Sequence, residues 1–139
     1  MKVYVFGEEN APVILLLPGT CCHWKGNFGH VILLLSDEYR VLCVSYDGFD
    51  ETERTEFPTM LEETAKIEDY LKANCGGYIR AAYGCSLGGS FVGLLAVRGE
   101  YPHGLRYPRQ LGLGPVLEIC GKIADRFAAA ADVPDAARR

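Results

Sequence analysis

The sequence predicts an α/β fold in which helices flank a mostly parallel sheet. Mainly apolar runs, typical of strands that are buried on both faces, occur at residues 12–17, 40–46 and 78–83, and the run at 12–17 is continuous. Segments with helical periodicity separate these runs, and no short hairpin turn lies between them. Strands that alternate with helices in this way are usually joined by crossovers, so we expect parallel pairing.

The first elements follow in order from these patterns. Residues 3–6 alternate as a strand does, and the strand at 12–17 ends abruptly at Pro18-Gly19-Thr20. A helix is expected at 24–35, because apolar residues recur there at steps of three and four. The next buried strand, at 40–46, stops at Asp47-Gly48, where Asp47 is expected to cap a turn.

A charged loop at 51–56 precedes the second predicted helix. Thr59 and Glu62 form a capping-box pattern, after which apolar positions fall on one helical face as far as Leu71. Cys75-Gly76-Gly77 is expected to end this helix. The strand at 78–83 and a helix-like run at 90–97 follow.

Between that strand and that run lies a Gly-x-Ser-x-Gly motif with Ser86 at its centre. In this context it predicts a nucleophile elbow, a sharp turn that exposes the serine hydroxyl at the end of a sheet. Gly84 and Gly88 are needed because a side chain at either place would collide with neighbouring backbone. The alternative is a glycine-rich turn that only packs.

A serine that attacks an acyl group also needs donors for the oxyanion that forms. The N–H group of Leu87, directly after Ser86, is one candidate. The N–H group of Thr20, in the turn after the strand at 12–17, is the other, and Cys21 is a second choice for that position. Ligands of open α/β sheets bind at the carboxyl ends of strands, where the segments 18–24, 47–50 and the elbow are expected to converge.

Residues 1–98 resemble the N-terminal half of an α/β-hydrolase. The resemblance lies in 13–20, where Pro18 replaces the family's frequent histidine, in 41–49 and in 84–89. It implies hydrolysis of a small-molecule ester, thioester or amide through an acyl-enzyme on Ser86, with no metal and no organic cofactor. It also implies the chain order Ser, then Asp or Glu, then His.

The acid and the base of that order are not identifiable in this chain. After Ser86 the sequence holds one histidine, His103, with one acid, Glu100, between them. His23, in the loop after the strand at 12–17, is a second candidate base. His30 is expected at the surface of its helix, and Cys85 is expected to pack beneath the elbow.

Residues 99–139 differ in character from the rest and form an atypical tail, predicted as a loop and a C-terminal helix. Residues 1–98 carry 8 basic and 13 acidic groups, whereas 99–139 carry 6 basic and 5 acidic groups. One hypothesis is that the tail is translated out of frame, so that the chain is a truncated hydrolase, weak or inactive, with an open sheet edge that invites a homodimer. The alternative is a naturally short protein.

Composition narrows the class of protein. The net charge of −4 and the pI near 5.3 provide no electrostatic footprint for nucleic acid. No apolar run reaches the length of a membrane span, and the N-terminus has no secretory pattern, so a cytoplasmic protein without a membrane partner is expected. The 6 cysteines lie at no metal-ligand spacing and are expected to be reduced thiols.

Three functions therefore stay open. The first is a serine hydrolase whose acid and base are missing from this chain. The second is a non-catalytic module on the same fold, which binds a small ligand or a partner. The third is an active short esterase, in which His23 or a dimer partner supplies the base.

Overall fold

The computed structural model describes residues 1–98, in which four strands and three helices alternate as the sequence predicts. Their bounds are β1 Lys2–Phe6, β2 Val13–Leu17, α1 Trp24–Ser36, β3 Arg40–Ser45, α2 Met60–Cys75, β4 Ala81–Gly84 and α3 Leu87–Arg98. The predicted loop and C-terminal helix of the tail lie outside the described residues, as do His103 and Glu100.

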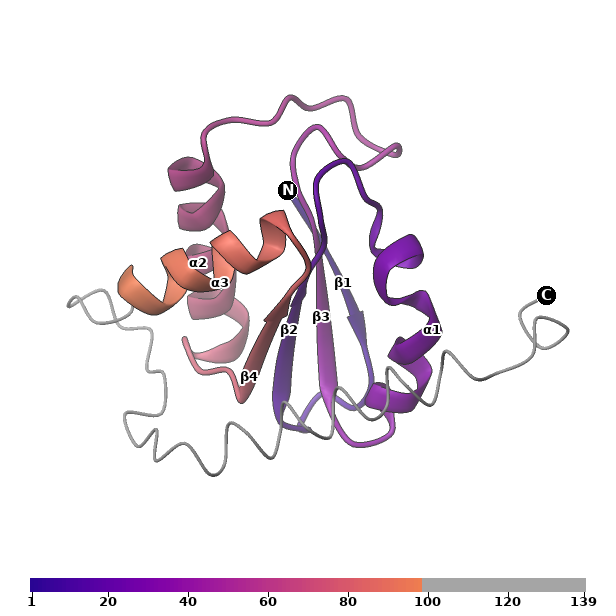
Figure 1. Ribbon diagram of the computed structural model, residues 1–139. Coiled ribbons are helices and arrows are strands. Elements are labelled where there is room, and N and C mark those ends of the chain that lie inside the picture. The colour runs from indigo at the N-terminus through magenta and orange to yellow at the C-terminus, as the bar shows by residue number, and fades with distance from the viewer. Residues whose placement is uncertain (99–139) are drawn as a thin grey trace, which may run out of the picture.

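The strands form one mixed sheet in the order β1-β3-β2-β4 (Figure 1). The central strand β2 pairs in parallel with β3 on one side and with β4 on the other. The edge strand β1 pairs with β3 in the antiparallel direction. The prediction of a mostly parallel sheet with flanking helices is confirmed, and β1 is its antiparallel member.

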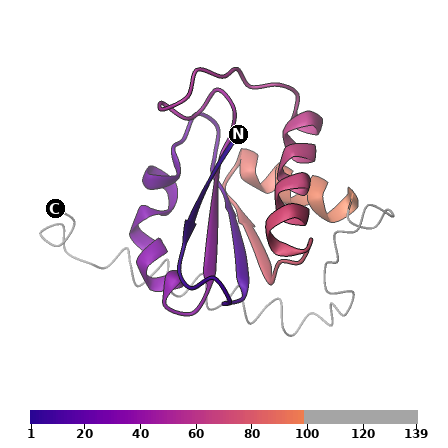
Figure 2. The same cartoon turned by 180° about the vertical axis from the view of Figure 1, so that it is seen from behind.

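The two faces of the sheet are covered by different helices (Figures 1 and 2). Helix α1 packs on one face, and α2 and α3 pack on the other. Alternate residues of β2 therefore enter two separate cores: Ile14 and Leu16 pack with α1, whereas Leu15 and Leu17 pack with α2 and α3. This explains why the strand at 13–17 is apolar at every position and why residues 41–44 of β3 are also all apolar.

The strand β4 departs from the predicted burial and from the predicted bounds. Its residues are half-buried or exposed, with 39% of Tyr83 accessible to solvent. Within residues 1–98, β4 pairs only with β2, so its other edge has no strand beside it there. The strand also begins at Ala81 rather than at 78, because Gly76 and Gly77 adopt positive φ angles of 59° and 74° and the chain is still turning at Tyr78.

The helix ends agree with the capping patterns. Thr59 and Glu62 form the predicted capping box at the start of α2, with both reciprocal hydrogen bonds present. Gly76 ends α2 in the left-handed conformation. At the far end of the described chain, the guanidinium of Arg98 donates two hydrogen bonds, of 2.8 and 3.0 Å, to the buried carboxylate of Glu68, which joins α3 to α2. In the part of the chain that the structure covers, no helix is long and apolar enough to cross a membrane.

Candidate active site

The topology of the sheet places two loops side by side. The chain leaves β2 toward the face that α1 covers, whereas it leaves β4 toward the face that α3 covers. Adjacent parallel strands whose following helices lie on opposite faces create a crevice at their carboxyl ends, and ligands of open α/β sheets bind in such crevices. The loop after β2 and the turn that carries Ser86 both lie at this end of the sheet.

Ser86 occupies a strained turn between β4 and α3. Its φ angle is 51°, a left-handed conformation that costs a non-glycine residue about 1–2 kcal/mol. The turn is tied to the sheet by the N–H group of Cys85, which donates to the carbonyl of Leu17 at 3.0 Å. The Ser86 side chain is exposed at the end of the sheet. Strain of this kind, held by surrounding backbone, is characteristic of functional sites.

The two glycines of the motif allow this turn to form. A Cβ at Gly84 would lie 2.1 Å from the carbonyl carbon of Gly88, and a Cβ at Gly88 would lie 2.0 Å from the carbonyl oxygen of Leu17. Both distances are far below van der Waals contact, and both obstacles are backbone atoms that cannot move aside. The prediction that a side chain at either position would collide with backbone is confirmed.

The loop after β2 reaches the nucleophile candidate directly. A Cβ built on Gly19 would lie 3.6 Å from Cβ of Ser86 and 3.5 Å from the carbonyl oxygen of Cys85. The loop then turns sharply, with a hydrogen bond of 3.2 Å from the N–H group of Cys22 to the carbonyl of Gly19 and a φ angle of 54° at Cys21. Pro18 and Gly19 are buried, whereas Thr20 and Cys21 are exposed.

The candidate oxyanion donors flank this contact. Leu87 is the first residue of α3, and an N–H group at that position has no partner inside its own helix. Thr20 directly follows the glycine that lies against Ser86. Their roles as donors, and that of Cys21 as a substitute, stay predictions.

Two residues that the sequence did not mark support the loop after β2. The buried Tyr46, directly after β3, donates a hydrogen bond of 3.1 Å from its hydroxyl to the carbonyl of Pro18. Asn27, in α1, accepts a hydrogen bond of 2.8 Å from the N–H group of Gly19. No sequence pattern marks such partners, because they come from elements that follow the loop by 8 and 28 positions.

His23 lies on the β1 side of the molecule. It caps α1, since its Nδ1 accepts a hydrogen bond of 3.3 Å from the N–H group of Lys25. Its ring contacts Tyr4 of β1 and Trp24, with centroid distances of 5.9 and 5.3 Å. Because β3 and β2 separate β1 from β4, these contacts do not bring His23 toward Ser86. His30 is exposed on α1, as expected.

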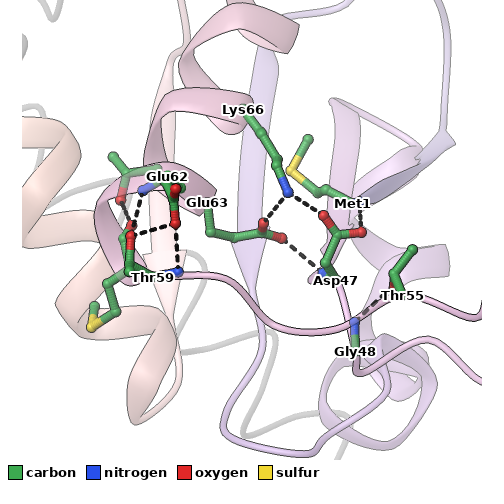
Figure 3. A network of polar contacts seen from close by, with 10 residues as sticks. Met1, Asp47, Gly48, Thr55, Thr59, Glu62, Glu63 and Lys66 are labelled. Atoms are coloured by element: carbon green, nitrogen blue, oxygen red, sulfur yellow. Dashed lines mark hydrogen bonds and ion pairs between the residues drawn. The ribbon is translucent and has the colours of Figure 1, made fainter.

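The carboxylates after β3 also point elsewhere. Asp47 forms ion pairs with the N-terminal ammonium of Met1 and with Lys66 (Figure 3). Burial alone would raise the pKa of Asp47, but the hydrogen bonds from these two cations lower it to about 2. Its N–H group donates to the buried Glu63 at 2.8 Å (Figure 3). The carboxylate of Asp47 is therefore bound by groups from other elements, and within residues 1–98 no hydrogen bond joins it to Ser86.

The carboxylate of Asp50 also has hydrogen-bond partners of its own. Its carboxylate accepts hydrogen bonds of 2.8 Å from the hydroxyl of Tyr4 and 2.9 Å from the N–H group of Thr52. Burial opposes ionisation, yet the bonds from Thr52 and Tyr4 together hold the pKa of Asp50 well below its usual range. Among residues 1–98, then, Ser86 has no carboxylate or imidazole as a hydrogen-bond partner.

A surface depression of about 660 Å³ lies at the opposite end of the sheet. It is lined by residues that precede β2, β3 and β4, which are Asn10, Pro12, Glu38, Tyr39, Tyr78 and Arg80. Since Ser86 follows the carboxyl end of β4, this depression is separate from the elbow. Within residues 1–98, no cluster of three or more side chains has the composition of a metal site.

Comparison with solved structures places the fold. No protein-family profile and no curated protein match the sequence. A Desulfitobacterium hafniense protein described as belonging to the α/β-hydrolase family superimposes with a TM-score of 0.67 and 30% identity, over 71% of this chain and 40% of that one. The chain has the α/β-hydrolase fold.

Two more distant hydrolases share this fold. An epoxide hydrolase from Vigna radiata superimposes with a TM-score of 0.59 and 24% identity, over 74% of this chain and 32% of that one. A 2-hydroxy-6-oxo-6-phenylhexa-2,4-dienoate hydrolase from a Rhodococcus strain superimposes with a TM-score of 0.57 and 22% identity, over 70% of this chain and 37% of that one. The chain thus spans well under half the length of these hydrolases, and the resemblance to the N-terminal half of the fold is confirmed.

Proposed function

We propose that this chain supplies the nucleophile and the oxyanion donors of a serine hydrolase that acts on small-molecule esters, thioesters or amides. The observation that carries this proposal is the left-handed Ser86, at φ 51°, on a strand-to-helix turn. The contact of that turn with the loop after β2 supports it, because a serine elbow and a second loop of donors are the two parts that acyl transfer needs.

In the proposed reaction, Oγ of Ser86 attacks the carbonyl carbon of the substrate while a base takes the hydroxyl proton. The electron pair of the carbonyl moves to oxygen, and the N–H groups of Leu87 and Thr20 donate hydrogen bonds to that oxyanion. Collapse of the tetrahedral intermediate expels the alcohol, thiol or amine, which takes up the proton. Water then hydrolyses the acyl-enzyme on Ser86 by the same steps.

The base is the open part of the proposal. His23 contacts Tyr4 of β1 rather than Ser86, and His103 lies outside the described residues. Members of a catalytic triad act as a unit, and a serine without its base retains only the contribution of binding and of the oxyanion hole. We therefore expect the 139-residue chain on its own to hydrolyse slowly.

A fluorophosphonate probe tests the nucleophile. We expect slow labelling of the folded chain that is abolished in Ser86→Ala and retained in Ser90→Ala, which removes an exposed hydroxyl one turn further along α3. Fast labelling, comparable with that of an intact hydrolase, would overturn the expectation of a weak enzyme and favour a base within the chain or a dimer partner. Labelling that survives Ser86→Ala would overturn the nucleophile assignment.

The second candidate function is a non-catalytic module that binds a small acyl or carbonyl ligand beside Ser86. It is favoured by the observation that, within the described part of the chain, Ser86 has no base as a partner. A folded sample that resists the probe, but whose Gly19 and Leu87 amide resonances shift with a simple acyl amide, would support this function instead.

A further inference from the structure

The peptide group between Pro18 and Gly19 is held at both ends by side chains from other elements. Its carbonyl oxygen accepts the hydrogen bond of 3.1 Å from the hydroxyl of Tyr46. Its N–H group donates the hydrogen bond of 2.8 Å to Oδ1 of Asn27. Because a trans peptide group is planar, its C=O and N–H groups point in opposite directions, and two partners on opposite sides fix the rotation of its plane.

The next peptide group continues from the first and is held by the turn that follows it. The carbonyl oxygen of Gly19 accepts a hydrogen bond of 3.2 Å from the N–H group of Cys22. The N–H group of Thr20 belongs to the same plane and therefore points away from that bond. In the part of the chain that the structure covers, it donates to no acceptor, so it can donate to a ligand bound beside Ser86.

Tyr46 can hold the Pro18 carbonyl firmly, because its hydroxyl remains a donor and its ring is packed. Burial, and then the nearby carboxylate of Glu63, raise the pKa of the Tyr46 hydroxyl far above its usual range, so the hydroxyl keeps its proton and remains a donor. Its ring stacks on Phe91 of α3 at a centroid distance of 4.6 Å and an angle of 25°. One side chain therefore contacts both the loop after β2 and the helix that follows the elbow.

We infer that Tyr46 and Asn27 are positioning residues, which together clamp the Pro18–Gly19 peptide and so aim the N–H group of Thr20 at the oxyanion formed beside Ser86. The inference rests on the proposed function, because that function gives the Thr20 donor its task. The clamp itself is measurable without any reaction, which keeps the two questions separate.

The experiment uses the full chain with Tyr46→Phe, Asn27→Leu and the double variant. The first keeps the ring that stacks on Phe91 and removes only the hydroxyl, and the second keeps a branched side chain of similar size without the acceptor. Tyr4→Phe is the matched control, since it removes a tyrosine hydroxyl whose bond to Asp50 is 2.8 Å long and lies on the other edge of the sheet. Amide hydrogen exchange at Gly19 and the rate of fluorophosphonate labelling of Ser86 are measured in each.

The effect of Tyr46→Phe on amide exchange at Gly19 decides whether the clamp exists, because Tyr46 does not itself bond the Gly19 N–H group. Tyr46→Phe leaves the acceptor of the Gly19 N–H group in place, yet a loosened peptide plane should speed exchange at Gly19 about fivefold, the effect of one net hydrogen bond. Asn27→Leu should speed it at least as much, and Tyr4→Phe should leave it within about twofold. Labelling of Ser86 should fall about fivefold in each single variant and by less than the product in the double variant, because both side chains hold one peptide.

Each result decides one question. Exchange at Gly19 that responds to Tyr46→Phe no more than to Tyr4→Phe overturns the clamp. Faster exchange with an unchanged labelling rate overturns the positioning role. If the unsubstituted chain is not labelled at all, the proposed function fails, while the exchange measurement still decides whether the clamp exists.

Discussion

The two loops that meet at Ser86 are held in place by different kinds of contact. The turn after β4 is fixed by backbone groups: Gly84 and Gly88 lie against carbonyl atoms, and the N–H group of Cys85 is bonded to the adjacent strand. The loop after β2 is fixed by side chains, with Tyr46 on one end of its first peptide group and Asn27 on the other. The turn after β4 therefore has no room for an added side-chain atom at its glycines. The loop after β2, in contrast, should become more mobile with each supporting hydrogen bond that is removed.

The largest expected effect tests the backbone contacts. A methyl group at position 88 would lie 2.0 Å from the carbonyl oxygen of Leu17, so Gly88→Ala must push α3 away from β2. We expect a loss of about 3 kcal/mol in the free energy of unfolding, measured by urea denaturation with circular dichroism.

Gly93→Ala provides the control for this prediction. Gly93 belongs to the same helix, but a Cβ there would meet no atom within 4 Å. Replacement of an exposed glycine within a helix by alanine should stabilise the protein by about 0.5–1 kcal/mol. Equal effects of the two substitutions, in either direction, would show that the packing of α3 against β2 is not what requires Gly88.

The second effect concerns the ion pairs beside Tyr46. Because the pKa of Asp47 is lowered to about 2 in the folded protein, its contribution to stability is present above the pKa of the unfolded chain, near 4, and is lost as the pH falls through 2. We expect Asp47→Asn to reduce the free energy of unfolding by about 2 kcal/mol at pH 7.

The pH profile distinguishes this ion-pair contribution from a packing defect. The difference between the original chain and Asp47→Asn should shrink below pH 4 and vanish only below pH 2, where the carboxyl is protonated in both the folded and the unfolded protein. A difference that stays constant from pH 7 to pH 2 would assign the loss to packing. Asp69→Asn is the control, since its carboxylate is exposed and its pair with Lys72 is 3.8 Å long.

The contrast between the loops also explains what the sequence can and cannot predict. The elbow was predictable because its requirement is local: glycines two positions on either side of a serine, after a strand and before a helix. The sheet was predictable for a similar reason, since strands such as β2 face two cores and are apolar at every position.

The supports of the loop after β2 were not predictable, because they depend on contacts between distant elements. Tyr46 looks like the last apolar residue of a strand, and Asn27 looks like an ordinary polar residue of a helix. The contacts of His23 were not predictable either, since a histidine in that loop suggests a base, whereas its packing beside Tyr4 and its capping of α1 depend on the fold. Its role as a base stays a prediction. The partners of Asp47 were not predictable for the same reason, because the N-terminus and Lys66 are remote from it in sequence.

The third effect concerns the edge beyond the elbow. Within residues 1–98, β4 pairs on one side only, and we propose that two copies of the chain associate through the other side in an antiparallel, symmetric contact. Tyr83→Lys would place two positive charges at that contact and should weaken self-association by about 1 kcal/mol, roughly fivefold in the dissociation constant.

Sedimentation velocity at several protein concentrations measures this association. Leu33→Lys is the control, because Leu33 is 76% exposed on α1, away from β4. If Leu33→Lys dissociates the chains as much as Tyr83→Lys does, the contact does not involve the β4 edge. A chain that sediments as a monomer at all concentrations would remove the proposal of a homodimer.

The smallest effect on stability, and the sharpest test of the two loops, comes from Gly19→Ala. Unlike Gly88, Gly19 has only ordinary contact distances around its missing Cβ, of 3.5 to 3.7 Å, and its φ angle is not left-handed. The variant should therefore fold, with a change of no more than about 0.5 kcal/mol in the free energy of unfolding.

The new methyl group would nevertheless lie 3.6 Å from Cβ of Ser86 and crowd the side on which the oxyanion donors are proposed. Slower fluorophosphonate labelling of Ser86 with unchanged stability would show that the loop after β2 borders the reacting atoms. Unchanged labelling would place the substrate on the other side of Ser86 and remove Thr20 as a donor.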